Sequence, residues 1–193
     1  MNCNIEAKFR HDVLQNTVNA TILSRWHALG LPNAWLVAGC LFQTVWNLQR
    51  GRPPSQGIKD YDLFYFDPSD LSEAAEAQAQ ARVKALLADL NATVEVANQA
   101  RVHLWYPGYF GRPCPPLQSS EDGIRRFLVL ETCLGIRPDA CHAPFGYAGL
   151  YAGSFTPNPL TPYPELFAAK VASYQARWPT AGREQVSLSV SEG

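Results

Sequence analysis

The 193-residue sequence contains few charged residues and almost no excess of either sign. Charged side chains make up 17% of the chain, and the formal net charge is -1. A protein held to nucleic acid by bulk electrostatic attraction needs a marked excess of Lys and Arg. We therefore expect no strong bulk binding of nucleic acid. Whole-chain disorder is also excluded, because hydrophobic residues reach 47% and the net charge is low.

Further absences concern membranes and compartments. No run of eighteen apolar residues occurs, so we expect no membrane span. The first ten residues lack the apolar stretch of a secretory signal. The five cysteines are scattered and form no CxxC pair, which favours reduced thiols over disulfides or a zinc site. We therefore expect a cytoplasmic protein.

The pattern of helices and strands predicts one α+β (α/β) domain, residues 1–193. A small mixed β-sheet with flanking helices is expected in 1–110, and a helical extension in 111–193. Helices are predicted over 10–29, from Gly39 onward, after an N-cap at Asp70, over 120–134, and from Pro164 to about Trp178. Strands are predicted over 34–38, 58–66, 93–97 and 101–106. The pair Asn98-Gln99 is expected to join the last two strands, and residues 143–164 to form an ordered loop.

Two aspartates lie two residues apart on the strand predicted over 58–66. Because strand side chains alternate between faces, Asp60 and Asp62 point the same way, about 6 to 7 Å apart along the strand. Like charges on a partly apolar face repel, and Mg²⁺ relieves this repulsion when it binds one or two carboxylates and substrate phosphates. The alternative is a solvated sheet edge, since DxD is a short and common pattern.

Three other features accompany this pair. Glu95 lies between β-branched residues and shares the aspartate face if the two strands are neighbours; otherwise it is an exposed glutamate. Gly39 and Cys40 open a helix directly after a strand, where a phosphate can approach backbone N–H groups, although glycine is common at such turns. Lys59 ends a stretch from residue 48 without acids, which suits a bound triphosphate or is an ordinary solvated loop.

Other candidates have simpler interpretations. Arg101, His103 and Trp105 alternate along the strand predicted over 101–106, and we favour a structural role for them over an acceptor pocket. Lys170 and Arg177 on the last helix could reach a phosphate, but the sequence alone does not favour this role. The P-loop, GxGxxG and GxSxG motifs are all absent.

The order of strand, Gly-Cys, helix, DxD strand, helix and a strand with a third acid resembles the DNA polymerase β-like nucleotidyltransferases. Longer blocks are similar to a small bacterial nucleotidyltransferase-like family within that superfamily. These blocks are WLVAGCLFQTVWN, GIKDYDLFYFD, VEVANQARVHLWY, and APFG followed by PNP. The resemblance covers roughly residues 10–179.

The resemblance implies a nucleotidyltransferase fold and transfer of a nucleotidyl group from a nucleoside triphosphate to an unidentified acceptor hydroxyl. It implies that Asp60, Asp62 and Glu95 are catalytic and hold Mg²⁺ or Mn²⁺, and that Gly39 and Cys40 face the triphosphate. Cys40 departs from the superfamily pattern of Gly or Ser, and a thiol is a weaker hydrogen-bond donor. Two alternatives stay open: a non-catalytic nucleotide-binding or interaction protein on the same fold, and a DxD glycosyltransferase that holds a sugar nucleotide through Mn²⁺.

Overall fold

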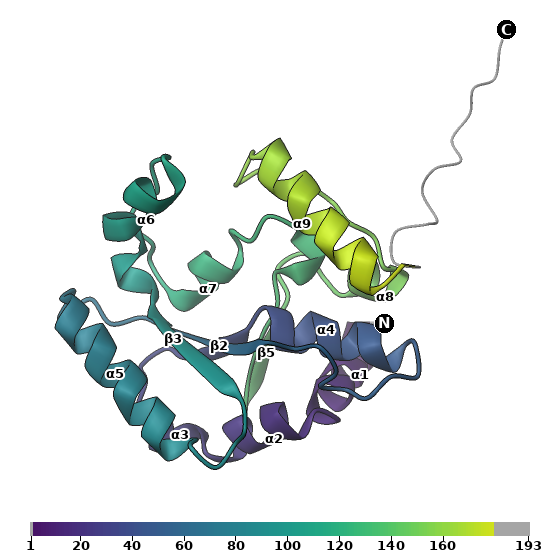
Figure 1. Ribbon diagram of the computed structural model, residues 1–193, viewed down its shortest axis with the longest axis horizontal. Helices are drawn as coiled ribbons and strands as arrows, with labels where there is room; N and C mark the ends of the chain where they lie inside the picture. The colour runs from purple at the N-terminus through teal and green to yellow at the C-terminus, as the bar shows by residue number, and fades with distance from the viewer. Residues whose placement is uncertain (1, 180–193) are drawn as a thin grey trace, which may run out of the picture.

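The computed structural model describes residues 2–179 and is built around a five-stranded mixed sheet with helices on both sides (Figure 1). The strands, in chain order, are β1 Trp35–Val37, β2 Asp60–Tyr65, β3 Thr93–Asn98, β4 Gly135–Arg137 and β5 Ala140–His142. Their order across the sheet is β3-β2-β1-β4-β5. The pair β2–β3 is parallel and the other pairs are antiparallel, which confirms the predicted α+β fold with a small mixed sheet.

The helices form two groups. Figure 1 shows α2, α3 and α5 on one side of the sheet and α6, α7 and α9 on the other. Their bounds are α1 Asn2–Leu14, α2 Thr17–Ser24, α3 Trp26–Leu29, α4 Gly39–Leu48, α5 Glu73–Leu86, η1 Gln99–Arg101, α6 Val102–Phe110, α7 Ser120–Ile124, η2 Leu130–Thr132, α8 Ala148–Ala152 and α9 Pro164–Arg177. None of these described helices is both long and apolar enough to cross a membrane.

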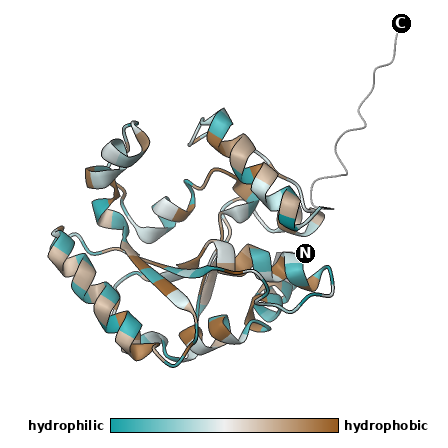
Figure 2. Ribbon diagram, viewed as in Figure 1, coloured by the Kyte–Doolittle hydropathy of each residue, from teal (hydrophilic) through white to brown (hydrophobic). Residues whose placement is uncertain are grey.

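The two faces of the sheet differ in what covers them. Tyr61, Leu63 and Tyr65 of β2 are buried in the main hydrophobic core, whereas Asp60, Asp62 and Phe64 alternate with them on a partly exposed face. This is the alternation predicted from the sequence, and Figure 2 shows the change of hydropathy along the central strands. The main core thus lies beneath the sheet and leaves the aspartate face open.

The free edge of β3 is closed by side chains of α5. The Gln80 Nε2 donates to the Val94 carbonyl oxygen at 2.8 Å, and the Val96 N–H donates to the Gln80 Oε1 at 2.7 Å. This amide makes the hydrogen bonds of a residue on a further parallel strand. The Glu76 carboxylate accepts the Asn98 N–H at 2.7 Å in the same manner. Since an unpaired strand edge recruits other strands, these two side chains protect β3 from pairing between molecules.

The helix predicted over 10–29 is divided into α1, α2 and α3. The first division falls at Asn16, which is fully buried and caps α2 by accepting the Val18 N–H at 3.1 Å. Its Nδ2 donates to the Thr44 hydroxyl at 3.1 Å and the Tyr61 hydroxyl at 3.2 Å. Because a side chain amide in the core satisfies these partners, the chain can turn there without leaving a buried polar group unpaired.

The strand predicted over 101–106 is wrong, and this segment is helical. The Asn98 side chain accepts the Ala100 N–H at 3.1 Å and begins η1, so Asn98-Gln99 does not join two strands. Arg101 is buried and forms an ion pair with Glu76. The alternation of residue types that suggested a strand therefore comes from a helix anchored at its start by one buried arginine.

The C-terminal half departs further from prediction. The helix predicted over 120–134 ends after five residues. Asn158 Nδ2 donates to the carbonyl oxygens of Arg125 and Phe127, both at 2.7 Å, so these carbonyls do not continue the helix. Neither β4 nor β5 was predicted, and the loop over 143–164 contains the short α8. The N-cap of α5 is Ser72, not Asp70, whereas the last helix is confirmed.

We predict that Gln80→Ala opens the β3 edge and promotes association between molecules. Loss of the amide leaves the Val94 carbonyl and the Val96 N–H unpaired on an edge strand. Size-exclusion chromatography with light scattering should show concentration-dependent dimers or larger species. Gln78→Ala, an exposed position on the same helix, is the control and should remain like the wild type. Identical elution of the Gln80 and Gln78 variants would contradict the edge-capping role.

Candidate active site

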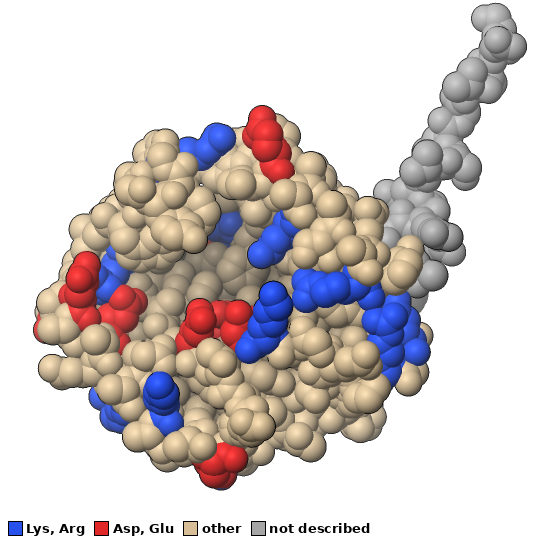
Figure 3. Space-filling view, in the orientation of Figure 1, with Lys and Arg blue, Asp and Glu red and all other residues tan. Residues whose placement is uncertain are grey.

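A cleft of about 770 Å³ lies over the polar face of β2. Asp60, Asp62 and Phe64 form part of its floor, the start of α4 forms one wall, and α9 runs along another. Figure 3 shows this hollow with acidic side chains inside it and Lys or Arg side chains beside them. A cavity of this size accommodates a small-molecule ligand.

The two aspartates are crowded and partly removed from water. Burial, together with the neighbouring charges of Asp60 and Glu95, raises the pKa of the Asp62 carboxyl from 3.8 to about 7. The ammonium group of Lys170 acts in the opposite direction and favours the ionised form. Ionisation of Asp62 therefore costs free energy in the metal-free protein, and a cation bound at the carboxylates would remove this cost.

Glu95 lies directly beside the pair but is not part of the cleft lining. Its position on β3 is in register with Asp62 on β2, as expected for neighbouring strands. The side chain is exposed and lines a second hollow of about 730 Å³, which also contacts Asp62 and Phe64. Within residues 2–179, no group of three His, Cys, Asp or Glu side chains is gathered closely enough to hold a metal ion. The donor set that fits Mg²⁺ is thus the aspartate pair, with phosphate oxygens completing the coordination.

The turn from β1 into α4 brings backbone close to the cleft. Ala38 has φ 61° and ψ −133°, a conformation that costs a non-glycine residue roughly 1–3 kcal/mol. A Cβ at Gly39 would lie 2.6 Å from Gln43 Nε2, so a larger residue there would displace the end of the Gln43 side chain. No side chain caps the first turn of α4, and both Ala38 and Gly39 line the cleft. Backbone N–H groups at a helix start are suited to a phosphate.

Cys40 follows Gly39 but its side chain does not line the cleft. The thiol is fully buried and donates to the Val37 carbonyl oxygen at 3.2 Å. Burial raises the pKa of this thiol well above its usual value, so it stays protonated. The difference between Cys and Ser at this position therefore concerns the packing under the turn. Cys40 does not line the cleft, whereas Ala38 and Gly39 do.

Four cations line the cleft: Lys59, Arg126, Lys170 and Arg177. Lys59 was a candidate from the sequence, whereas a phosphate contact was not favoured for Lys170 and Arg177. The Arg177 Nη1 donates to the Gln43 Oε1 at 3.2 Å, and its carbonyl accepts from Arg52 Nη1 at 2.8 Å. Spacing on one face of the last helix was the available signal, but only the tertiary structure shows that this face meets β2.

Aromatic packing holds α9 against α4. The Tyr174 ring centroid is 5.2 Å from that of Phe42 and 5.4 Å from that of Trp46. Trp178 is fully buried, and its Nε1 donates to the Asn47 Oδ1 at 2.9 Å. These contacts position the cleft-facing side of α9, including Lys170, above the aspartates.

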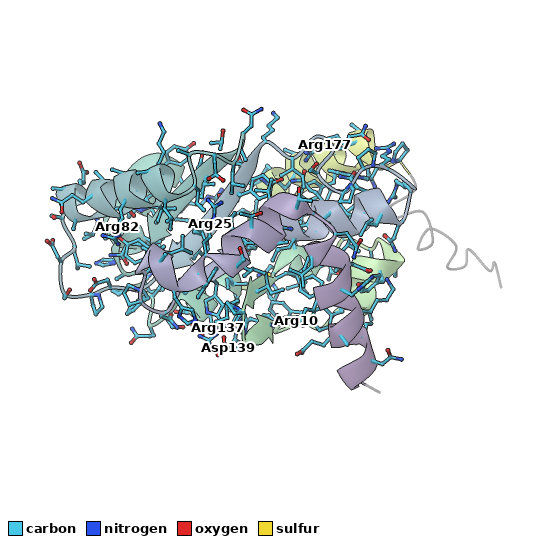
Figure 4. All side chains as sticks on the ribbon, turned by 90° about the horizontal axis from the view of Figure 1, so that it is seen from below. Arg10, Arg25, Arg82, Arg137, Asp139 and Arg177 are labelled. Atoms are coloured by element: carbon cyan, nitrogen blue, oxygen red, sulfur yellow. The ribbon has the colours of Figure 1, made fainter. Side chains whose placement is uncertain are left out.

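Several arginines elsewhere have structural partners (Figure 4). Arg10 of α1 donates to the Arg137 carbonyl oxygen at 3.0 Å, and Arg25 forms an ion pair with Asp89. Arg82 of α5 reaches carbonyl oxygens at the end of α3. These side chains connect elements of the fold away from the cleft.

The structure therefore brings four of the candidate residues together along one cleft: Gly39, Lys59, Asp60 and Asp62. The Cys40 side chain and Glu95 lie outside its lining, although both adjoin it in the chain or in the sheet. A mixed sheet that carries paired aspartates beside a helix start is the arrangement of a nucleotidyltransferase-type fold.

Comparison with known proteins agrees with this class. Residues 24–181 match a sequence family described as nucleotidyltransferase, and the chain belongs to that family. The fold is similar to a solved structure described as "The NMR structure of the protein reveals a CCA-adding enzyme head domain", with a TM-score of 0.69 and 23% identity. The similarity covers 85% of this chain and 87% of that one, and it concerns the fold alone. A search of curated proteins finds no match.

We predict that Asp62→Asn stabilises the metal-free protein at pH 8. Because the folded-state pKa is raised to about 7 from 3.8, ionisation of Asp62 lowers stability progressively as the pH rises between these values. The gain in unfolding free energy should therefore be small near pH 4, grow towards pH 7 and reach about 4 kcal/mol above it. Urea unfolding in EDTA at several pH values measures it.

Asp67→Asn serves as the matched control for this measurement. Hydrogen bonds from Ser69 lower the pKa of Asp67, so its ionised form is favoured in the folded state. Its substitution should leave stability unchanged or reduce it. A loss of stability in Asp62→Asn at pH 8 would contradict the assignment of Asp62 as a costly, crowded carboxylate.

Proposed function

We propose that the protein is a metal-dependent nucleotidyltransferase that transfers a nucleotidyl group from a nucleoside triphosphate to an acceptor hydroxyl. The observation that carries the proposal is the crowded Asp60–Asp62 pair on the floor of a cleft bordered by cations and an uncapped helix start. Each component suits a different part of a metal-bound triphosphate.

Asp60 and Asp62 would hold Mg²⁺ or Mn²⁺. Two carboxylates plus phosphate oxygens are a donor set that Mg²⁺ prefers, and their repulsion is the cost that a cation relieves. Glu95, in register with Asp62 on the next strand, is the candidate for the third carboxylate. It would act as the base for the acceptor hydroxyl, or as a further ligand that joins the pair only when the metal binds. The metal would supply charge neutralisation at the transferred phosphoryl group.

The remaining residues would bind and orient the triphosphate. Backbone N–H groups at the start of α4, from Gly39 and Cys40, suit the terminal phosphates. Lys59, Lys170 and Arg177 offset the charge of the phosphates from two sides of the cleft. Because phosphoryl transfer depends mainly on positioning and electrostatic stabilisation, these contacts are what the reaction requires of the protein.

A non-catalytic nucleotide-binding protein is the alternative that Cys40 suggested. The thiol is turned away from the cleft and bonded to Val37, so it does not alter the lining. We therefore favour the enzyme. The two candidates differ in one outcome: an enzyme releases pyrophosphate in the presence of a suitable acceptor, whereas a binding protein retains the intact triphosphate.

We predict that Mg²⁺ with a nucleoside triphosphate stabilises the wild type and not Asp60→Ala/Asp62→Ala. At a ligand concentration of 100 times Kd, the expected rise in Tm is about 5 °C. Thermal shift with ATP, GTP, CTP and UTP, each with Mg²⁺ or Mn²⁺, measures it.

Asp67→Ala, at the other end of β2, is the control for the double variant and should respond like the wild type. UDP-glucose with Mn²⁺ tests the glycosyltransferase alternative. Equal shifts of the double variant and wild type would refute the metal site, and a preference for UDP-glucose over all four triphosphates would refute the proposed reaction.

A further inference from the structure

The cleft has two chemically different ends, and α9 runs along both. Its cleft-facing residues change from Arg177 and Lys170 to Leu166, and then to Tyr163 just before the helix begins. With a rise of 1.5 Å per residue, Leu166 and Arg177 are separated by roughly 16 Å along the axis. The gradient of polarity along one helix thus distinguishes a cationic end from an apolar end.

Aromatic side chains from three parts of the chain form the apolar end. Tyr106 and Phe110 of α6 stack with ring centroids 4.5 Å apart, and Phe64 of the floor meets Phe127 edge-on at 5.7 Å. Phe110 is 38% exposed, which is unusual for a large apolar side chain in a concave site. Burial and the hydroxyl of Tyr163 raise the pKa of Tyr106 to about 12, so its ring remains uncharged.

The two arginines near this end, Arg126 and Arg112, each have a partner. The Arg126 Nε lies 3.3 Å from the Asp122 Oδ1, and the Arg112 guanidinium stacks on the Tyr163 ring, 4.3 Å from its centroid. The Thr161 hydroxyl at the wall is only 8% exposed and has no hydrogen-bond partner within residues 2–179. This end therefore offers rings and one unpaired hydroxyl, with no cluster of cations for a phosphate.

The geometry of phosphoryl transfer relates the two ends. The attacking and leaving oxygens lie roughly in line through the phosphorus. The leaving pyrophosphate suits the cationic end, near Arg177 and the start of α4, with the α-phosphorus above the aspartates. The attacking hydroxyl must then come from the opposite direction, which is the end formed by Tyr106, Phe110 and Leu166.

We infer that this apolar end is the acceptor subsite and that the acceptor is an uncharged molecule with an aromatic or apolar body that carries a hydroxyl group. The inference rests on the proposed function. In the step, the acceptor oxygen forms a bond to the α-phosphorus, and the bond from that phosphorus to the bridging oxygen breaks. The electron pair leaves with pyrophosphate, and the hydroxyl proton passes to a carboxylate on the polar face of β2 and β3.

The test measures binding of tyrosol, a neutral phenol with a hydroxyethyl group, by isothermal titration and ligand-observed NMR. Titrations are made with and without Mg²⁺ and a non-hydrolysable triphosphate. Phe110→Ala should weaken tyrosol binding about tenfold, as expected for loss of a ring contact, and leave triphosphate affinity unchanged. Leu104→Ala is the matched control, because Leu104 is 54% exposed on the same helix and does not line the cleft.

Two comparison ligands make the outcome specific: ribose 5-phosphate and the dinucleotide ApA, both of which carry hydroxyl groups and phosphate. Saturable tyrosol binding that Phe110→Ala weakens and Asp60→Ala/Asp62→Ala retains would support the inference. Absence of saturable tyrosol binding, equal affinity in Phe110→Ala and wild type, or displacement of tyrosol by ApA or ribose 5-phosphate would overturn it. Failure of the wild type to bind any triphosphate is a separate result that rejects the proposed function.

Discussion

The packing of α9 against α4 is the contact on which the cleft depends. Tyr174 and Trp178 insert among the aromatic side chains of α4, and the Trp178 indole N–H bonds to Asn47 in the core. Without this contact the cleft would lose the wall that carries Lys170 and Arg177. Residues more than a hundred positions apart along the chain, Asp62 and Lys170, interact electrostatically because this contact places α9 above the strand.

The hydrophobic core stabilises the fold, whereas several features of the cleft lower its stability. The main core fills the face of β2 opposite the aspartates and continues between α4 and α9, where Phe42 and Tyr174 also line the cleft. On the cleft side, Ala38 has a positive φ and Asp62 is ionised only against burial and neighbouring charges. Strain and crowded charges of this kind are typical of functional sites, where a ligand relieves them. The same core also allows α5 to protect the β3 edge through Gln80 and Glu76.

Local sequence patterns were sufficient for the central part of this arrangement. The alternation in IKDYDLFYF predicted which side of β2 carries the aspartates, and the glycine after a short apolar run predicted the start of α4. Glu95 was expected on the same face if its strand was a neighbour of β2, and the parallel register provides that condition. Such predictions succeed because they depend on the periodicity of the backbone alone.

The predictions that were wrong concern elements whose structure depends on long-range contacts. Alternating residues after Asn98 suggested a strand, but the Asn98 cap and the buried Arg101–Glu76 pair start a helix instead. Asn158 ends α7 from 33 residues away, and β4 and β5 are too short to show a period. Lys170 was considered for a phosphate contact but not favoured, because its role becomes clear only when α9 lies over β2.

The central claim is that Asp60 and Asp62 hold a divalent cation beneath a triphosphate whose terminal phosphates point towards α4 and the C-terminal part of α9. A crystal structure with Mn²⁺ and a non-hydrolysable nucleoside triphosphate, with anomalous scattering to locate the metal, tests it most directly. We expect a manganese peak about 2.2 Å from oxygens of both aspartates, with the γ-phosphate near Gly39 and Arg177. A metal bound elsewhere, or a triphosphate lying among Tyr106 and Phe110, would contradict it.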